Sequence, residues 1–293
     1  MFENFSELGL GTSNLASFGR ALSFKKAKNL IDQAIDAEIK TFDTADAYAS
    51  GDTERLIGRI IQNKRDKIFI ISKVGLPYID FPEFLSPLNQ FGKKILQTIN
   101  IEKNYSSKYI LSNIKKSLRR LNTEYLDAYL LHDFTISDNL EYKDECFEAL
   151  YKIKKQGLSK YIGVSSNDKQ TLNFSIKNGN IDIIQTKIDF SNSFEESFKE
   201  IKDYNYKLIV NSIFRQKLND NKMIKFDSLL KNFQIPKDDK NLVLLAYCLQ
   251  KNNVSCAIFG TKNLSHLYQI AKGYKNYKYY QKELFEKLNE IFI

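Results

Sequence analysis

The stretch TFDTADAYASGDTERLIG, Thr41–Gly58, decides the fold of this chain. An apolar run at Ile39–Asp43 is followed by a turn of small and polar residues, and the apolar spacing then changes to that of a helix at Thr53–Gln62. This pattern predicts a strand, a loop and a helix. Such a unit displays Asp43 at the carboxyl end of a strand and Tyr48 on the following loop, where α/β barrels place reacting groups.

The same unit recurs along the chain. Alternation of strand and helix favours parallel strands joined by right-handed crossovers, and eight such units can close into a barrel covered by helices. We therefore predict an α/β fold, a (β/α)8 barrel formed as a single domain from residues 1–293. The predicted strands are Leu8–Gly11, Ile39–Asp43, Ile68–Lys73, Leu126–His132, Tyr161–Ser165, Ile183–Lys187, Leu208–Asn211 and Ala257–Gly260. The predicted helices are Phe24–Ala37, Thr53–Gln62, Ser107–Leu121, Glu145–Lys154, Lys169–Ile176, Phe194–Asp203 and Leu242–Lys251.

Two longer segments interrupt the alternation. Gly75–Ser106 follows the third predicted strand and is a long, aromatic, proline-bearing loop. A barrel would hang it over its active face, where it either shapes a substrate pocket with Phe81, Phe84 and Phe91 or packs as a surface loop. The second segment, Ile213–Asp239, is predicted to be irregular. After the last strand, two terminal helices are predicted to close part of the mouth, at Asn263–Gly273 and Gln281–Ile293.

The charge of the chain indicates which partners suit it. Its 293 residues include 44 basic and 35 acidic side chains, a formal net charge of +9, and the lysines are dispersed rather than gathered in one arm. Such a surface favours an anionic small molecule, for example a phosphorylated cofactor. The sequence contains no aromatic RNA-binding motif and no zinc-ligand pattern, so no specific nucleic-acid partner is predicted.

Cysteine usage indicates the redox environment. Cys146, Cys248 and Cys256 are odd in number, widely spaced and without a CxxC pair, which argues against a disulfide framework and a structural zinc site. The N-terminal sequence MFENFSELGLGTSN carries acidic residues instead of a basic region, and no apolar run reaches membrane-spanning length. We therefore predict a cytoplasmic protein that does not insert into a membrane.

Polar side chains terminate the predicted strands. Lys73 ends IFIISK, His132 ends DAYLLH, and Gln185 lies in DIIQTK. Because the carboxyl ends of all strands meet at one face of a barrel, these side chains are expected to lie near Asp43 and Tyr48. A phenol, an ammonium, a carboxylate and an imidazole suit the donation of a proton to a carbonyl oxygen. The pattern therefore favours a reduction.

Tyr48 is the expected acid. A free phenol has a pKa near 10 and works slowly at neutral pH unless its anion is stabilised. Lys73, kept charged by pairing with Asp43, would stabilise the phenolate and lower the pKa of Tyr48. His132 would hydrogen-bond the substrate carbonyl and hold it for hydride attack. Since no side chain donates hydride, a nicotinamide must supply it.

At these residues the chain resembles an aldo-keto reductase, from GLGT at Gly9–Thr12 to FGTKNLSHL at Phe259–Leu267. The FDTADAY, SLRRLNTEYLDAYLLH and IGVSS blocks are similar to motifs of this family. The family's catalytic tetrad matches Asp43, Tyr48, Lys73 and His132. The resemblance implies an NAD(P)H-dependent oxidoreductase that reduces an aldehyde or ketone, sugar carbonyls included, to an alcohol. It also implies a cofactor extended across the strand ends without a Rossmann fold, and the lone GLG lacks the third glycine and the spacing of a dinucleotide fingerprint.

The resemblance assigns contacts to the nicotinamide carboxamide. Ser165 and Gln185 match residues that hydrogen-bond it. Many relatives have Asn directly after this serine, whereas here Ser166 follows and Asn167 comes one position later. Either of the two is a candidate for that contact.

Two further regions concern the rest of the cofactor. Asn211 stands where relatives often have an aromatic residue that stacks on the nicotinamide, and Phe214 is a candidate replacement. In the segment Gly260–His266, Thr261 and Lys262 could hold a 2′-phosphate, although His266 replaces the arginine that is frequent at the end of this loop. NADP(H) is therefore favoured over NAD(H).

Taken singly, these residues have ordinary alternatives: Asp43 could cap a turn, Lys73 could be a surface charge, and His132 could be a core imidazole. An alternative function is a barrel that binds the cofactor as a redox sensor or regulatory subunit with little turnover. A metal-dependent hydrolase would be short of ligands, with two histidines and no HxH or HExxH cluster, so no metal is predicted. The expected partner is a small-molecule carbonyl substrate, and the oligomeric state stays open.

Overall fold

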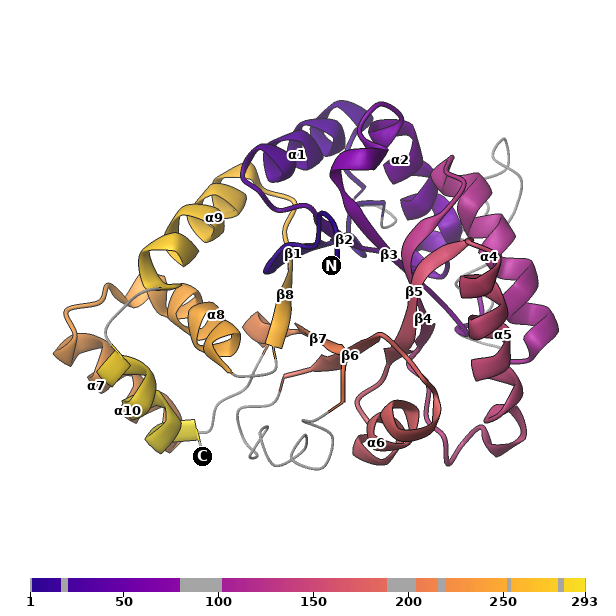
Figure 1. Cartoon of the computed structure of the whole chain (residues 1–293). Coiled ribbons are helices and arrows are strands. Elements are labelled where there is room, and N and C mark those ends of the chain that lie inside the picture. Colours follow the sequence, from indigo (N-terminus) through magenta and orange to yellow (C-terminus); the bar gives the residue numbers. More distant parts are fainter. Residues whose placement is uncertain are drawn as a thin grey trace.

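Eight parallel strands pair in chain order and close into a barrel, with β1 against β8, in the computed structural model of the protein (Figure 1). The structure describes residues 2–16, 21–79, 102–188, 204–215, 220–251, 254–278 and 282–292. The predicted (β/α)8 fold is confirmed. The strands are β1 (Leu8–Gly11), β2 (Thr41–Asp43), β3 (Phe69–Val74), β4 (Leu126–His132), β5 (Ser159–Ser165), β6 (Ile183–Lys187), β7 (Lys207–Asn211) and β8 (Val254–Gly260).

Helices surround the strands on the outside of the barrel (Figure 1). Ser23 caps α1 by accepting a hydrogen bond from the amide of Lys26, and Ser106 caps α4 by accepting one from the amide of Tyr109, as helix starts require. The helices are α1 (Phe24–Asp36), α2 (Asp52–Ile61), α4 (Ser107–Leu121), α5 (Glu145–Lys155), α6 (Lys169–Asn178), α7 (Asp220–Asn232), α8 (Lys240–Gln250), α9 (Leu264–Lys278) and α10 (Lys282–Phe292).

Alternate strand residues fill the interior of the barrel. Side chains two positions apart along a strand share a face. Three polar residues each follow a buried interior residue by two positions: Lys73 follows Ile71, His132 follows Leu130, and Gln185 follows Ile183. These polar residues therefore continue the interior face at the carboxyl end. One apolar cluster is built from strand residues alone: Phe69, Ile71, Ala128, Leu130, Ile183, Ile209, Cys256 and Ile258. A larger cluster contains the buried side chains of the other strand face and of the surrounding helices.

Aromatic rings pack at the amino end of this interior. Phe2 stacks on Tyr161 with ring centroids 3.8 Å apart, and Phe5 meets Phe69 edge to face at 5.0 Å. These rings pack against the interior strand cluster. The polar ends of the strands therefore lie at the opposite face of the barrel.

Helix α7 corrects one prediction. The segment Ile213–Asp239 was expected to be irregular, but it contains this helix, whose buried residues are Phe226, Leu229 and Leu230. The ring of Phe226 meets that of Phe292 on α10 edge to face, with centroids 5.6 Å apart. The apolar face of α7 is narrow and is covered by a helix distant in sequence, which a local pattern does not reveal.

Other predictions fall outside the described residues. These are the helix Phe194–Asp203 and most of the loop Gly75–Ser106, with Phe81, Phe84 and Phe91.

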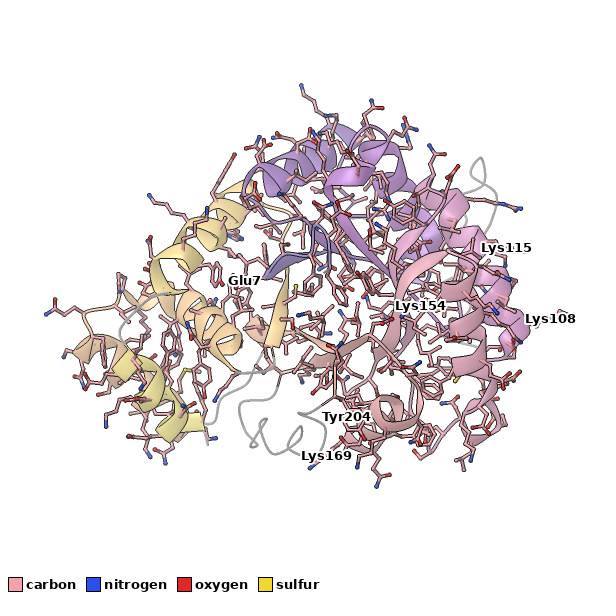
Figure 2. The ribbon with its side chains drawn as sticks, in the orientation of Figure 1. Glu7, Lys108, Lys115, Lys154, Lys169 and Tyr204 are labelled. Atoms are coloured by element: carbon pink, nitrogen blue, oxygen red, sulfur yellow. The ribbon has the colours of Figure 1, made fainter. Side chains whose placement is uncertain are left out.

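The described surface agrees with the dispersed charge. Lys108 and Lys115 lie on the outer side of α4, and Lys169 lies apart from them at the start of α6 (Figure 2). Among the described residues, no helix is both long and apolar enough to cross a membrane.

Candidate active site

The carboxyl ends of β2 to β6 bring the expected reacting groups to one place. Asp43 pairs in register with Ile71, two positions before Lys73. Lys73 pairs in register with Leu130, two positions before His132. His132 is level with Ser165, which is level with Gln185. Parallel pairing in this register therefore places five polar side chains along neighbouring strand ends.

Lys73 and Asp43 form a buried ion pair. The ammonium lies 2.6 Å from Asp43 Oδ1, and the two side chains are 2% and 7% exposed. Lys73 Nζ also donates a hydrogen bond to the carbonyl oxygen of Thr44 at 2.9 Å, and Gln185 Nε2 donates to Asp43 Oδ1 at 3.1 Å. A buried pair needs such additional bonds to offset its desolvation. The site therefore holds a fixed positive charge.

A tight turn presents Tyr48 to this charge. Ala49, Ser50 and Gly51 follow it with φ angles of 49°, 55° and 87°. Left-handed backbone costs a residue with a Cβ about 1–2 kcal/mol, and a Cβ on Gly51 would lie 2.8 Å from Arg120 Cδ. The left-handed backbone and the close contact with Arg120 thus restrict which residues this turn can contain.

The Tyr48 ring lies near two of the other expected reacting groups. Lys73 Nζ is 5.1 Å from the ring centroid, while the imidazole of His132 meets the ring edge to face at 5.7 Å. The structure thus brings Asp43, Tyr48, Lys73 and His132 together.

The pKa of Tyr48 corrects a second prediction. Burial of the phenol raises its pKa above the ordinary value, Lys73 lowers it, and the Asp43 carboxylate raises it again. The net pKa is raised, so the expected net lowering is wrong. The phenol keeps its proton at neutral pH and is available as a proton donor, with Lys73 beside it.

The imidazole of His132 is neutral. Burial lowers its pKa well below the ordinary value, and the positive charges of Lys73 and Lys103 lower it further. Its Nδ1 is buried without a hydrogen-bond partner among the described residues. A neutral imidazole carries one N–H donor, which suits a hydrogen bond to a substrate carbonyl.

This neutral imidazole has a consequence for stability. We expect the free energy of unfolding to fall as pH drops below about 6.5, because His132 takes up a proton in the unfolded chain before it does in the folded one. The slope from this one group reaches about 1.4 kcal/mol per pH unit. Urea unfolding between pH 5 and 7 measures it, and His132→Asn should reduce the slope. The same replacement at the exposed His266 is the control. Equal slopes in wild type and His132→Asn would contradict a neutral imidazole in the folded protein.

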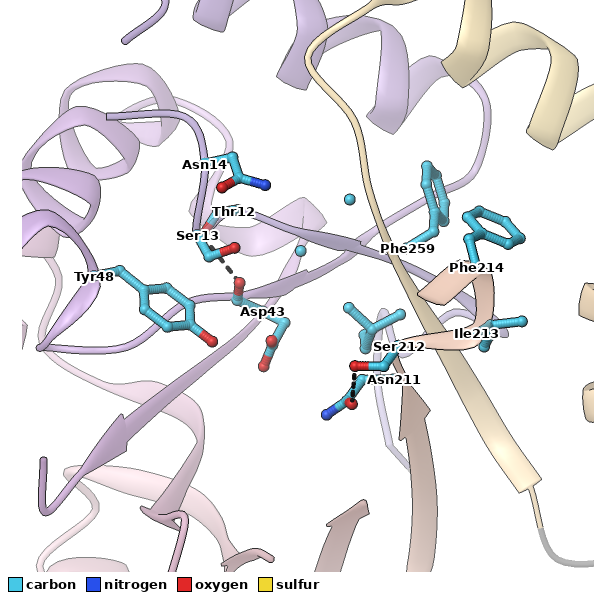
Figure 3. A pocket seen from close by; sticks show the side chains of 13 residues that line it. Thr12, Ser13, Asn14, Asp43, Tyr48, Asn211, Ser212, Ile213, Phe214 and Phe259 are labelled. Carbon is cyan, nitrogen blue, oxygen red and sulfur yellow. Dashed lines mark hydrogen bonds between the residues drawn. The ribbon is translucent and has the colours of Figure 1, made fainter. Parts of the chain in front are cut away.

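A cavity of about 250 Å³ adjoins Tyr48 and Asp43 (Figure 3). Thr12 at the end of β1 holds one wall, since its amide and hydroxyl both donate to the carbonyl oxygen of Asp43, at 3.0 and 2.9 Å. Asn211, Ser212 and Phe214 belong to the far wall. The lining residues are Gly11, Thr12, Ser13, Asn14, Asp43, Tyr48, Asn211, Ser212, Ile213, Phe214, Ile258, Phe259 and Gly260.

Sequence reasoning missed several of these cavity residues. Ser13, Asn14 and Ser212 were not among the candidates. All three come just after a strand, in β1–α1 and β7–α7 connections, and polar residues at that position are the signal that was available.

The candidates for the carboxamide contact lie on β5 and β6 or just after β5. Ser165 and Ser166 are buried, and Gln185 is fully buried with an Oε1 that has no partner among the described residues. Ser166 Oγ accepts a hydrogen bond from the Asp168 amide at 3.2 Å. Asn167 is exposed, and its Oδ1 accepts one from the Lys187 amide at 3.0 Å.

The remaining candidates lie around β7, β8 and α9. Phe214 lies next to Phe259, away from Tyr48 (Figure 3). Gly260 lines the cavity, and Thr261 Oγ1 accepts a hydrogen bond from the Asn263 amide at 3.0 Å. Lys262 lies just before α9 and His266 lies in its first turn, and both are exposed. In the described parts of the chain, no group of three or more His, Cys, Asp or Glu side chains is placed to hold a metal ion.

Comparison with known proteins agrees with this geometry. The sequence model of the Aldo/keto reductase family matches residues 7–291. The chain is 34% identical over 180 residues to the uncharacterized oxidoreductase YqkF of Bacillus subtilis (strain 168), a match covering 61% of this chain and 50% of that protein. It is 30% identical over 182 residues to the D-threo-aldose 1-dehydrogenase of a Pseudomonas species, covering 60% and 55%. The matches thus span about half the length of these relatives.

A solved structure shows the same fold along the whole chain. The holo form of an aldo-keto reductase from Bacillus halodurans is similar with a TM-score of 0.78 at 24% identity, covering 99% of this chain and 93% of that chain. The family match extends over nearly all 293 residues. The chain belongs to the aldo/keto reductase family.

Proposed function

We propose that the protein is an oxidoreductase that reduces the carbonyl group of an aldehyde or ketone to an alcohol with a nicotinamide cofactor. The observation that carries this proposal is the buried Lys73–Asp43 ion pair, 2.6 Å long, beside the phenol of Tyr48. An ordinary surface lysine would be solvated, whereas this one is buried and its ammonium lies 5.1 Å from the ring centroid of a tyrosine. Such an arrangement is expected where a phenol must lose a proton.

Each reacting group has one role in this proposal. Tyr48 donates its proton to the carbonyl oxygen, and the Lys73 ammonium stabilises the phenolate that remains. Asp43 keeps Lys73 charged, because burial lowers the pKa of Lys73 but Asp43 and Tyr48 raise it above the ordinary value. His132, which is neutral, donates an N–H to the same carbonyl oxygen and orients it.

The residues at the strand ends fit a nicotinamide. The buried Gln185 Oε1 is an acceptor without a partner among the described residues, and a carboxamide N–H would satisfy it. Ser165 and either Ser166 or Asn167 are proposed to complete this contact. When bound, the nicotinamide supplies the hydride. Asn211, Phe214 and Gly260 line the cavity along which the rest of the cofactor is proposed to lie.

A panel of substrates tests the function. Purified protein is mixed with NADPH or NADH and with aldehydes, ketones and aldoses, and cofactor oxidation is followed by absorbance. Aldoses are also tested with NADP⁺ or NAD⁺, because one relative is a D-threo-aldose 1-dehydrogenase. Turnover of any carbonyl supports the proposal. Tight cofactor binding with negligible turnover in both directions would favour a redox sensor instead.

A preference for NADP(H) is proposed to depend on Lys262 and Thr261. We expect Lys262→Gln to weaken NADPH binding about tenfold, since a hydrogen bond to a charged group contributes about 1.5 kcal/mol or more, and to leave NADH binding unchanged. His266→Arg should strengthen NADPH binding. Fluorescence titration with both cofactors measures these changes.

Lys272 supplies the control for this pair of variants. It is exposed on α9, ten residues after Lys262, which lies just before that helix. Lys272→Gln should leave the affinity for both cofactors as in wild type. An equal loss for NADPH and NADH in Lys262→Gln would contradict a 2′-phosphate contact.

A further inference from the structure

Three consecutive residues, 103 to 105, bond to the ends of the two strands that carry Lys73 and His132. The amide of Asn104 donates to the carbonyl oxygen of Gly75 at 3.0 Å, just after β3. The hydroxyl of Tyr105 donates to the carbonyl oxygen of His132 at 2.7 Å, and Lys103 Nζ donates to that of Asp133 at 2.7 Å. We call residues 103–105 the clasp.

Tyr105 is the part of the clasp that touches both strand ends. Its side chain is fully buried. Gly75 has a φ of 127°, and a Cβ there would lie 2.0 Å from Tyr105 Cε1, so the ring packs directly on the backbone two residues after Lys73. The ring also meets Phe134, two residues after His132, edge to face at 4.9 Å. Burial raises the pKa of Tyr105, so its hydroxyl remains a donor at neutral pH.

The backbone beside His132 needs such support. Asp133 has a φ of 57°, so the chain leaves the extended conformation directly after His132. The imidazole Nδ1 has no hydrogen-bond partner among the described residues, so that atom does not fix the orientation of the ring. The position of the imidazole therefore depends on the backbone to which the ring is attached, together with the packing of the ring against Tyr48.

We propose that Tyr105 is a positioning residue for the reduction, which holds the His132 imidazole in place relative to Lys73 through its hydrogen bond to the His132 carbonyl and its packing on Gly75. The inference rests on the proposed function for its catalytic meaning. The positioning of His132 by Tyr105 is a property of the protein without cofactor or substrate. A displacement of about 1 Å in a reacting group can lower turnover up to about 10²-fold.

Tyr78 offers a matched control. Its hydroxyl donates to Asn113 Oδ1 at 2.8 Å, a bond of nearly the same length as that of Tyr105, but the acceptor lies on the outer helix α4. Tyr105→Phe removes a buried phenol hydroxyl and Tyr78→Phe a half-buried one, each with its hydrogen bond. Both should lower the free energy of unfolding by a similar amount, about 1 kcal/mol. Only Tyr105→Phe removes a hydrogen bond to the carboxyl end of β4.

The test uses the imidazole signals of the protein without cofactor, followed by NMR against pH. The chain has two histidines, and the exposed His266 provides an internal reference. In Tyr105→Phe we expect the His132 signal to move and its pKa to rise toward the ordinary value, because a released ring gains solvent. The charged and titratable groups facing His132 are Tyr48, Lys73 and Lys103, and none of them differs between the variants. Tyr78→Phe should leave the His132 signal as in wild type.

Kinetics supply the second readout. We expect Tyr105→Phe to lower kcat about tenfold, within the range for a misplaced reacting group, with the Kd for NADPH unchanged. Unmoved His132 signals in Tyr105→Phe, or equal shifts in both variants, would overturn the proposal. A moved signal in a protein that turns over no carbonyl would leave the positioning of His132 standing and reject the reduction.

Discussion

Tyr48→Phe is expected to abolish carbonyl reduction while the protein still binds NADPH. The replacement removes the phenol hydroxyl, which is the proposed proton donor, and keeps the ring that lines the cavity. General acid catalysis contributes about 10²–10⁴-fold, so kcat should fall by that factor. The raised pKa of Tyr48, caused first by burial, means that the wild-type phenol is protonated at the pH of the assay.

Three measurements make this prediction specific. Steady-state kinetics with the best carbonyl of the panel give kcat, and fluorescence titration gives the Kd for NADPH, which should equal that of wild type. Tyr151→Phe, on the exposed face of α5, is the matched control and should keep full turnover. If Tyr48→Phe reduces the carbonyl as fast as wild type does, another group supplies the proton.

The barrel could be predicted because each strand can be recognised from its own stretch of sequence. Each strand is a short apolar run, such as IFII before Lys73 or DAYLL before His132, and the polar residue that ends the run marks the carboxyl end. Two strand boundaries differ from the prediction: β5 begins at Ser159 and β8 at Val254, before the apolar runs that predicted them. Around β8 the register with β7 shifts between Leu208 and Ile209, an irregularity that strand pairing creates and that a local pattern does not contain.

The placement of the candidate reacting groups was predictable, but their energetics were not. Asp43, Lys73 and His132 end apolar runs, and Lys73 and His132 continue an interior face two residues after Ile71 and Leu130. The net pKa of Tyr48 depends on how much water the folded site excludes, and burial outweighs the Lys73 charge that the sequence suggested. The contacts of the clasp could not be predicted from the sequence either, because Tyr105 meets the His132 carbonyl only through tertiary packing.

Lys73→Met is expected to remove turnover and to destabilise the protein. The carboxylate of Asp43 would then be buried with its Gln185 hydrogen bond but without its counter-ion. Breaking a buried ion pair by removing one partner costs about 3–5 kcal/mol. Since the ammonium also stabilises the Tyr48 phenolate, kcat should fall at least about 10²-fold, within the contribution of acid catalysis. Urea unfolding and steady-state kinetics measure the two effects.

A second variant separates these two effects. Asp43→Asn combined with Lys73→Met removes both charges, so the unfolding free energy should recover relative to Lys73→Met alone, whereas kcat should stay low because no cation faces Tyr48.

The pair Arg120–Glu54 is the control for the loss of a buried ion pair, since Nε and Oε2 are 2.7 Å apart, the side chains are 5% and 0% exposed, and the pair joins α2 to α4. Glu54 Oε1 also accepts a hydrogen bond from Ser72 Oγ at 2.6 Å, and a glutamine keeps that acceptor oxygen. Glu54→Gln should lower stability but keep turnover per folded molecule. Recovery of turnover in the double variant would show that Lys73 only supports the fold. Low turnover in a stable double variant would show that its charge acts on the reaction itself.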